Sequence, residues 1–163
     1  MIVRLAKIED ANQGICVLRS SIIKLCENDH HSNIDQIKDW LANKTTDIWC
    51  NWVNSAKFSL FIAELDGEIA GVSMISLNGV ILLNYVSPDY RFKGISKAIL
   101  NHMEEYAKNI GILMCTLQST YTYKDFKILM ATNLKIITKK NWKCISFYKK
   151  YIYLINKYFF ILL

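Results

Sequence analysis

The sequence predicts a single α/β domain of the α+β type, in which an antiparallel meander of strands is combined with several helices. Three observations lead to this prediction: two hairpin signals between apolar runs, two amphipathic runs with helical spacing, and a basic turn that joins an apolar run to a helix-like run. The chain has 163 residues, of which 52% are hydrophobic, and this is enough apolar surface for the core of one domain.

The N-terminal third predicts one strand followed by two helices. Residues 1–5 form a short apolar run typical of a strand. Glu9 and Asp10 then open a run to residue 26 with apolar residues at helical spacing. Residues 34–41 predict a second helix. The apolar positions of the two helices are Ile15, Leu18, Ile22, Leu25 and Cys26 in the first, and Ile34, Ile37 and Leu41 with Trp40 beside them in the second.

The middle of the chain predicts an antiparallel meander of three strands. Residues 58–65 and 68–77 are apolar runs rich in residues that favour strands, and Asp66-Gly67 between them is a strong two-residue hairpin signal. Asn78-Gly79 repeats this signal before the run 80–86. A helix-like run over 95–110, which ends at Gly111, and a short apolar strand over 113–117 complete the expected core of the domain.

The most informative segment is the basic turn between the run 80–86 and the helix-like run 95–110. The first amides of a helix have no acceptor within the helix and lie at the positive end of its dipole, so they can bind a phosphate. Gly94 lets the backbone approach a ligand closely, and Arg91 and Lys93 add positive charge. The alternative is an ordinary strand–turn–helix junction, because this pattern is short.

Arg91-x-x-Gly94-x-Ser96 resembles the Arg/Gln-x-x-Gly-x-Gly/Ala signature of the GNAT (Gcn5-related) N-acetyltransferases, with Ser96 in place of the usual Gly or Ala. The expected order of elements, β-α-α-β-β-β-α-β, is that of the GNAT fold, and the resemblance covers roughly residues 2–120. The resemblance implies the full order β-α-α-β-β-β-α-β-α-β, in which a mixed, mostly antiparallel sheet carries helices on both faces. Four shorter segments are also similar to one bacterial subgroup of this family: residues 25–30, 40–45, 84–88 and 119–122.

The resemblance implies an enzyme that moves an acetyl group from acetyl-coenzyme A (acetyl-CoA) to a primary amine of a small molecule or peptide, without a metal. It implies that Tyr85 and Val86 pair with the amides of the pantetheine arm as an added strand does, with the Val86 amide facing the thioester oxygen. Ser119 would lie near this arm. The pyrophosphate would bind to a loop that consists of Arg91, Phe92, Lys93, Gly94, Ile95, Ser96 and Lys97.

The catalytic groups follow the family pattern less closely. The family usually places a tyrosine acid where this chain has Lys127, and Tyr123, one helical turn earlier, can substitute for it. Asn84 can position a water that takes the proton of the amine. Asp29 and His30 lie in a segment that borders the acceptor site in this family. The structural alternatives are a core or surface aromatic for Tyr123 and a helix cap for Asp29.

Composition excludes several other classes of protein. Five cysteines lack C-x-x-C spacing, and Cys16, Cys26 and Cys115 fall at apolar-face positions, so we expect buried free thiols in a reducing cytoplasm. Charged residues interrupt the N-terminal run, and no apolar run is long enough to span a bilayer. We therefore expect a cytoplasmic monomer or homodimer that binds neither nucleic acid nor a membrane.

The C-terminal segment, residues 127–163, departs from the family pattern. Residues 1–120 carry 11 basic and 13 acidic side chains, whereas residues 121–163 carry nine lysines and one acid. The expected Asn-Gly-Tyr motif is missing, yet the codons of residues 129–134, read in another frame, permit Asn-Gly-Tyr-Lys-Phe. We interpret residues 1–126 as family-like and the remainder of this single domain as a product of a frameshift; chance agreement of a short back-translation is the alternative.

This departure leaves other functions open. One is a degenerate relative that binds acetyl-CoA with little or no turnover, because the segment that carries the acid is altered. Another is binding of nucleic acid or anionic lipid through the lysines and aromatic residues of the tail, which we favour least. We expect residues 134–138, 143–148 and 151–154 to form strands that replace part of the ancestral sheet.

Overall fold

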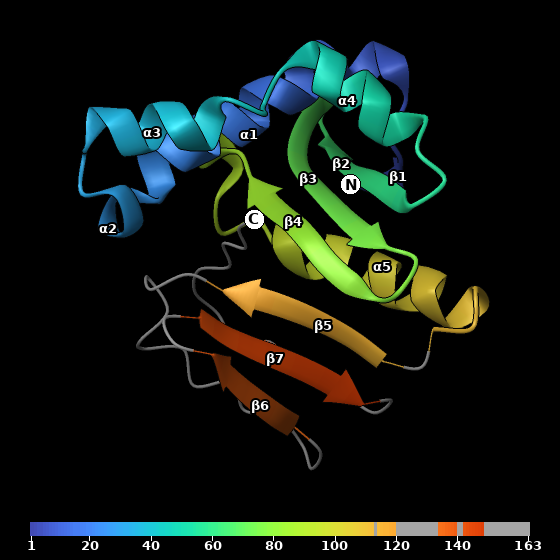
Figure 1. The fold of residues 1–163 in the computed structure, drawn as a ribbon. Coiled ribbons are helices and arrows are strands. Elements are labelled where there is room, and N and C mark those ends of the chain that lie inside the picture. The colour runs from blue at the N-terminus through green and yellow to red at the C-terminus, as the bar shows by residue number, and fades with distance from the viewer. Residues whose placement is uncertain (113, 120–133, 140–141, 149–163) are drawn as a thin grey trace.

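The computed structural model describes residues 1–112, 114–119, 134–139 and 142–148 (Figure 1). They form a seven-stranded sheet with the order β1-β2-β3-β4-β5-β7-β6, in which only β4 and β5 are parallel neighbours. The strands are β1 (Ile2–Leu5), β2 (Phe58–Leu65), β3 (Glu68–Ser76), β4 (Val80–Val86), β5 (Met114–Ser119), β6 (Leu134–Lys139) and β7 (Trp142–Tyr148). The helices are α1 (Ala11–Leu25), α2 (Glu27–His30), α3 (Ile34–Leu41), α4 (Thr46–Val53) and α5 (Ile95–Asn109). The predicted mixed, mostly antiparallel sheet is confirmed.

The meander of β2, β3 and β4 follows the turn signals in the sequence. Asp66 and Gly67 have φ angles of 55° and 84°, as the two central residues of a type I′ turn require, so Leu65 pairs with Glu68. In the second turn, the Gly79 N–H donates to the Ser76 carbonyl at 2.9 Å. Both hairpins are therefore confirmed, but the second turn has Leu77 and Asn78 at its centre, with Gly79 after them at a φ of 84°, instead of the predicted two-residue Asn78-Gly79 turn.

Two helices, the short α2 and the longer α4, were not expected from the sequence. The Thr45 side chain accepts from the Ile48 N–H at 3.3 Å and caps the first turn of α4. The side chain of Trp49 in this helix is fully buried. Upstream, the predicted first helix begins as a 3-10 turn at Ile8–Asp10, and α1 itself starts at Ala11.

Two apolar positions of the predicted helices are exposed, and for Cys16 this overturns the predicted burial. Ile34 is 68% exposed because it begins α3 at the outer end of the molecule, whereas Leu41 of the same helix is buried. Cys16 is exposed because the buried side of α1 carries its neighbours Ile15 and Val17. The four cysteines whose side chains are described are free thiols, of which one is buried, two are half-buried and one is exposed: Cys26, Cys50, Cys115 and Cys16.

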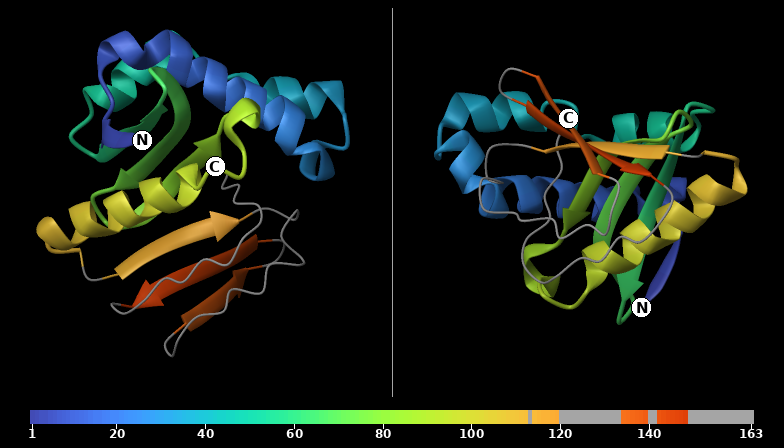
Figure 2. Two further views of the ribbon diagram at one scale, coloured as in Figure 1. Left: turned by 180° about the vertical axis from the view of Figure 1, so that it is seen from behind. Right: turned by 90° about the horizontal axis from the view of Figure 1, so that it is seen from below.

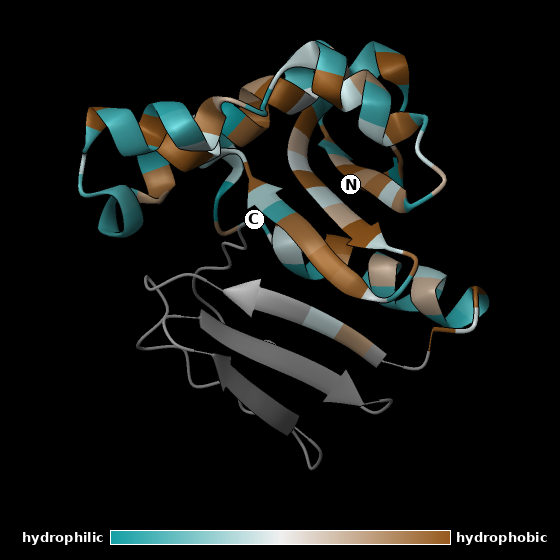
Figure 3. Cartoon of the chain, in the orientation of Figure 1, coloured by the Kyte–Doolittle hydropathy of each residue, from teal (hydrophilic) through white to brown (hydrophobic). Residues whose placement is uncertain are grey.

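Two hydrophobic clusters cover opposite faces of the sheet. One packs Leu18 of α1 and Trp49 of α4 against β2, β3 and β4, and the other packs Ile99 of α5 against the same strands. Phe61 and Ile62 are adjacent in β2 and belong to different clusters, as the alternation of side chains along a strand requires. Figure 3 shows the apolar strands in brown and the outward sides of the helices in teal. The left view of Figure 2 shows α5 in front of the strands.

The sheet opens between β4 and β5. β4 pairs with β3 from Ile81 to Val86, but it pairs with β5 only at Val80–Thr116 and Ile81–Leu117. The two parallel strands diverge from that point toward their carboxyl ends (Figure 1). The divergence leaves the last residues of β4 with one edge that no described strand covers.

The C-terminal strands extend the sheet beyond β5. β7 pairs antiparallel with β5 along six residues, and β6 pairs antiparallel with β7. The strands predicted at 134–138 and 143–148 are therefore confirmed. The helix expected after β5 and the strand expected at 151–154 lie outside the described residues, and the proposed frameshift remains a hypothesis about the gene.

Candidate functional site

The open edge of β4 presents peptide groups at alternate residues. The Ser87 N–H donates to the Ala70 carbonyl at 2.9 Å, and Tyr85 pairs with Val72. In an antiparallel ladder these two residues direct their N–H and C=O groups toward β3. Asn84 and Val86 therefore direct their peptide groups to the open edge, where an extended ligand can pair with them, whereas the peptide groups of Tyr85 face β3.

The N-terminus of α5 lies beside this edge and carries free amides. Gly94 caps the helix with a φ of 78°, and no side chain accepts from its first turn. The first hydrogen bond of the helix runs from the Ala98 N–H to the Gly94 carbonyl at 3.0 Å. Among the described residues, no group accepts from the amides of Ile95, Ser96 and Lys97. These amides and the helix dipole make a site for an anion.

Asn84 connects β4 to the first turn of α5. Its side chain is fully buried, and its Nδ2 donates to the Ser96 Oγ at 2.9 Å. Its Oδ1 is also buried and has no hydrogen-bond partner in the described structure. Because a buried carbonyl oxygen without a donor is costly, this atom is a candidate acceptor for a ligand N–H or a water. Sequence reasoning identified Asn84 but not its bond to Ser96.

Gly71 in β3 determines how closely α5 approaches the sheet. A Cβ added at this position would lie 2.6 Å from the Ile95 Cγ2 and 2.7 Å from the Ile99 Cδ1. Only a glycine allows the first turn of α5 to pack at this distance, and that turn carries the free amides. Sequence reasoning missed Gly71, although a glycine in the middle of an apolar strand is a signal of close approach.

The loop before α5 combines cations with aromatic rings. The Arg91 guanidinium lies 4.8 Å from the centroid of the Phe92 ring, and the Lys93 Nζ lies 4.9 Å from that of Tyr90. Lys97 is exposed on the first turn of the helix. Positive charge therefore surrounds the free amides, and the arrangement suits a ligand with two or more negative charges.

The His30 side chain is buried and makes hydrogen bonds within the fold. It is 2% exposed, its Nδ1 accepts from the Ser32 N–H at 3.1 Å, and its Nε2 lies 3.1 Å from the Ile22 carbonyl. The carbonyl requires a donor, so Nε2 is assigned as the donor and Nδ1 as the acceptor. Both nitrogens are then occupied, and the ring has no nitrogen left for an acceptor substrate. The neighbouring Asp29 is half-buried.

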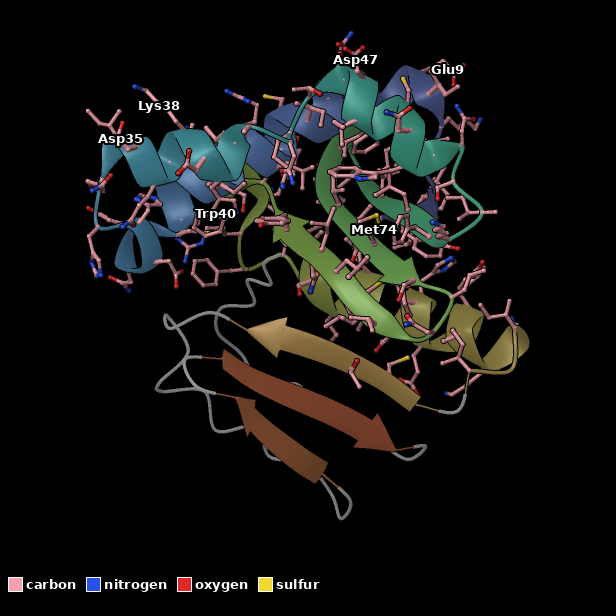
Figure 4. All side chains as sticks on the ribbon, in the orientation of Figure 1. Glu9, Asp35, Lys38, Trp40, Asp47 and Met74 are labelled. Atoms are coloured by element: carbon pink, nitrogen blue, oxygen red, sulfur yellow. The ribbon has the colours of Figure 1, made fainter. Side chains whose placement is uncertain are left out.

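A second pair of polar groups lies on the opposite face of β4. The Tyr85 hydroxyl and the Trp40 Nε1 are buried near each other, and neither makes a hydrogen bond of ordinary geometry in the described structure. Burial raises the pKa of Tyr85 well above its ordinary value, the nearby Cys26 adds to this shift, and the Trp40 Nε1 opposes it. Figure 4 shows Trp40 on the inner side of α3, with Asp35 and Lys38 on the outer side. The phenol is therefore neutral, and sequence reasoning did not single out either polar atom.

The remaining predicted site residues are described in part or not at all. Ser119 ends β5, where only its backbone is described, and Tyr123 lies outside the described residues. In the part of the chain that the structure describes, no three His, Cys, Asp or Glu side chains gather as metal ligands do. None of the described helices has the length and apolar character to cross a membrane.

Comparisons with known proteins identify the family. The model of the acetyltransferase (GNAT) family matches residues 25–125. No protein of curated function matches the sequence significantly. The fold is similar to that of PaiA N-acetyltransferase from Thermoplasma acidophilum, which was solved in complex with coenzyme A. The two sequences are 20% identical, the match covers 90% of this chain and 98% of that chain, and the TM-score is 0.73.

Two further structures have the same fold. A GCN5-related N-acetyltransferase from Rhodopseudomonas palustris has 19% identity, covers 90% of this chain and 94% of its own, and gives a TM-score of 0.72. A probable acetyltransferase from Staphylococcus epidermidis has 14% identity, with coverages of 91% and 99% and a TM-score of 0.61. Because the family model spans most of the chain, the protein belongs to the GNAT family of acetyltransferases.

Proposed function

We propose that the protein transfers an acetyl group from acetyl-CoA to a primary amine of a small molecule or peptide. The observation that carries this proposal is the position of the free amides of α5 beside the open edge of β4. The membership of the chain in an acetyltransferase family supports it. So does the similar fold of PaiA N-acetyltransferase, which was solved with coenzyme A.

The residues of this chain suit coenzyme A at three points. The amides of Ile95, Ser96 and Lys97 would bind the diphosphate, with charge from the loop before α5. The pantetheine arm would lie along the open edge of β4, where it would pair with the peptide groups of Asn84 and Val86. The unpartnered Asn84 Oδ1 would accept an amide N–H of the arm.

In this proposal the acetyl thioester supplies an activated acyl group. The neutral amine attacks the carbonyl carbon, so that a C–N bond forms while the C–S bond breaks and the thiolate leaves. The nitrogen, which carries a positive charge after the attack, releases one proton to solvent water. The Val86 N–H at the open edge would stabilise the negative charge that develops on the carbonyl oxygen. Tyr123 would protonate the leaving thiolate. We reassign Asn84 from positioning a water to binding the cofactor, because its side chain is directed toward α5.

Binding of coenzyme A tests the first half of the proposal. Gly94→Glu places a carboxylate among the free amides and should weaken binding, measured by titration calorimetry, by at least about tenfold, or ~1.4 kcal/mol. Gly111→Glu is the matched control, because Gly111 also has a positive φ and open space at its Cβ but lies after the other end of α5. Equal binding by the wild type and both variants would contradict the proposed site.

Turnover tests the second half of the proposal. Release of free thiol from acetyl-CoA in the presence of a panel of amines should increase with pH, because only the neutral amine reacts and an unperturbed alkylamine has a pKa of about 10. The alternative is a degenerate relative that binds acetyl-CoA without turnover. Lys127 at the position of the family's acid favours this alternative, and tight binding without thiol release would establish it.

A further inference from the structure

Phe92 combines unusual exposure with an unusual backbone conformation. Its side chain is 70% exposed, more than any other large hydrophobic side chain in the described residues. Its φ of 63° lies in the left-handed region, which a bulky residue without a local hydrogen-bonding side chain rarely adopts. A bulky residue in this conformation is strained, and strain of this kind often marks a binding site.

The surroundings of this ring suit an aromatic, negatively charged ligand. The Arg91 guanidinium lies 4.8 Å from the centroid of the ring. Gly94, two residues later, caps α5, the helix whose first amides are free. The fully buried Asn84, bonded to Ser96 in the same turn, has an Oδ1 without a partner, which points independently to a ligand at this end of α5.

We propose that the Phe92 ring is a stacking platform for the adenine of coenzyme A. This inference rests on the proposed function and extends it to the nucleotide half of the cofactor. With the pantetheine arm on the edge of β4 and the diphosphate on the amides of α5, the adenosine lies on the side of the loop before the helix. Phe92 presents an exposed ring there, and Arg91 strengthens the site because a guanidinium attracts both aromatic faces and phosphates.

The test compares two ligands that differ in the adenosine portion. Coenzyme A contains the adenine, whereas 4′-phosphopantetheine contains the same arm with a single phosphate and no nucleoside. Phe92→Asn removes the ring but keeps a residue type that tolerates a positive φ, and Phe92→Trp keeps an aromatic face. Ile34→Asn is the control, because it removes an equally exposed apolar side chain from α3, outside this loop.

Titration calorimetry should show that Phe92→Asn weakens coenzyme A about tenfold and leaves 4′-phosphopantetheine within about twofold of the wild type. Phe92→Trp and Ile34→Asn should bind both ligands as the wild type does. The melting temperature of ligand-free Phe92→Asn should equal or exceed that of the wild type, because the strain is relieved.

Two results would overturn the platform while leaving the proposed function intact. One is unchanged affinity of Phe92→Asn for coenzyme A. The other is equal weakening of both ligands, which would mean that Phe92 acts through the shape of the loop. Failure of the wild-type protein to bind coenzyme A would instead contradict the proposed function and remove the basis of the platform.

Discussion

The two halves of β4 have the same kind of sequence but different surroundings. Ile81 pairs with strands on both sides, Val80 pairs with β5, and Ile81 is buried in the cluster beneath α5. Asn84 and Val86 pair with β3 alone, and Asn84 and Tyr85 each bury a polar atom without a partner, on opposite faces of the sheet. The closed half of β4, Val80 and Ile81, stabilises the fold. The open half, residues 84–86, leaves hydrogen-bonding groups that a ligand can use.

The largest expected effect concerns the closed half. Ile81→Ala removes a buried side chain that is 6% exposed and should lower the free energy of unfolding by about 3 kcal/mol. Denaturant unfolding measures this loss. Coenzyme A should bind the folded variant with unchanged affinity, and a tenfold loss of affinity would mean that the two halves are not independent. Leu82→Ala, at a half-buried neighbour, is the control and should cost less.

The second prediction disturbs the binding site beside the open half of β4 by pushing α5 away from the sheet. Gly71→Ala places a Cβ against Ile95 and Ile99 and should destabilise the fold by about 2 kcal/mol. It should also weaken coenzyme A about tenfold, because the first turn of α5 is displaced. Addition of Ile95→Ala should recover part of both losses, since it restores the space. Additive losses in the double variant would contradict the steric explanation.

The third prediction separates binding from stability at Asn84. Asn84→Leu removes a buried amide with one unpartnered oxygen, so the ligand-free protein should unfold within about 1 kcal/mol of the wild type. Coenzyme A should bind about fivefold more weakly, because the acceptor for the pantetheine arm is lost. Ser96→Ala removes the partner of Nδ2 but leaves Oδ1, and it should affect binding less. Wild-type affinity in Asn84→Leu would exclude this contact.

The smallest expected effect is the contribution of Tyr85 to the loss of stability at alkaline pH. Burial raises the pKa of its phenol above the ordinary value of about 10. Above that pH the unfolded chain ionises while the folded chain keeps the proton, so stability is lost as the pH rises. Tyr85→Phe should reduce this loss and stabilise the protein at neutral pH by up to about 1 kcal/mol, because an unpartnered hydroxyl is removed. Identical pH profiles of unfolding would contradict the assignment.

The elements that the sequence predicted best are those with local signals. Asp66-Gly67 and the apolar run 80–86 predicted the meander of strands, and the basic turn that contains Gly94 predicted the start of α5. The cap of α4 at Thr45 was also local, and the spacing of Trp49 and Trp52 behind it would have been enough to find this helix.

The site depends on contacts between segments that are distant in the sequence. The bond between Asn84 and Ser96 and the contact between Gly71 and Ile95 follow from how α5 lies across the sheet. The length of the open edge depends on where β4 and β5 part, and residue spacing does not determine that point. The resemblance located the loop, but only the fold located the buried acceptor beside it.

The amide signals of the first turn of α5 test the central claim most directly. In two-dimensional ¹H–¹⁵N NMR spectra, addition of coenzyme A should shift the amides of Ile95, Ser96 and Lys97 strongly, because charged phosphate oxygens would accept from them. The amide of Ile81, in the closed half of β4, should change little. Strong shifts elsewhere in the protein, with the three α5 amides unmoved, would contradict the account.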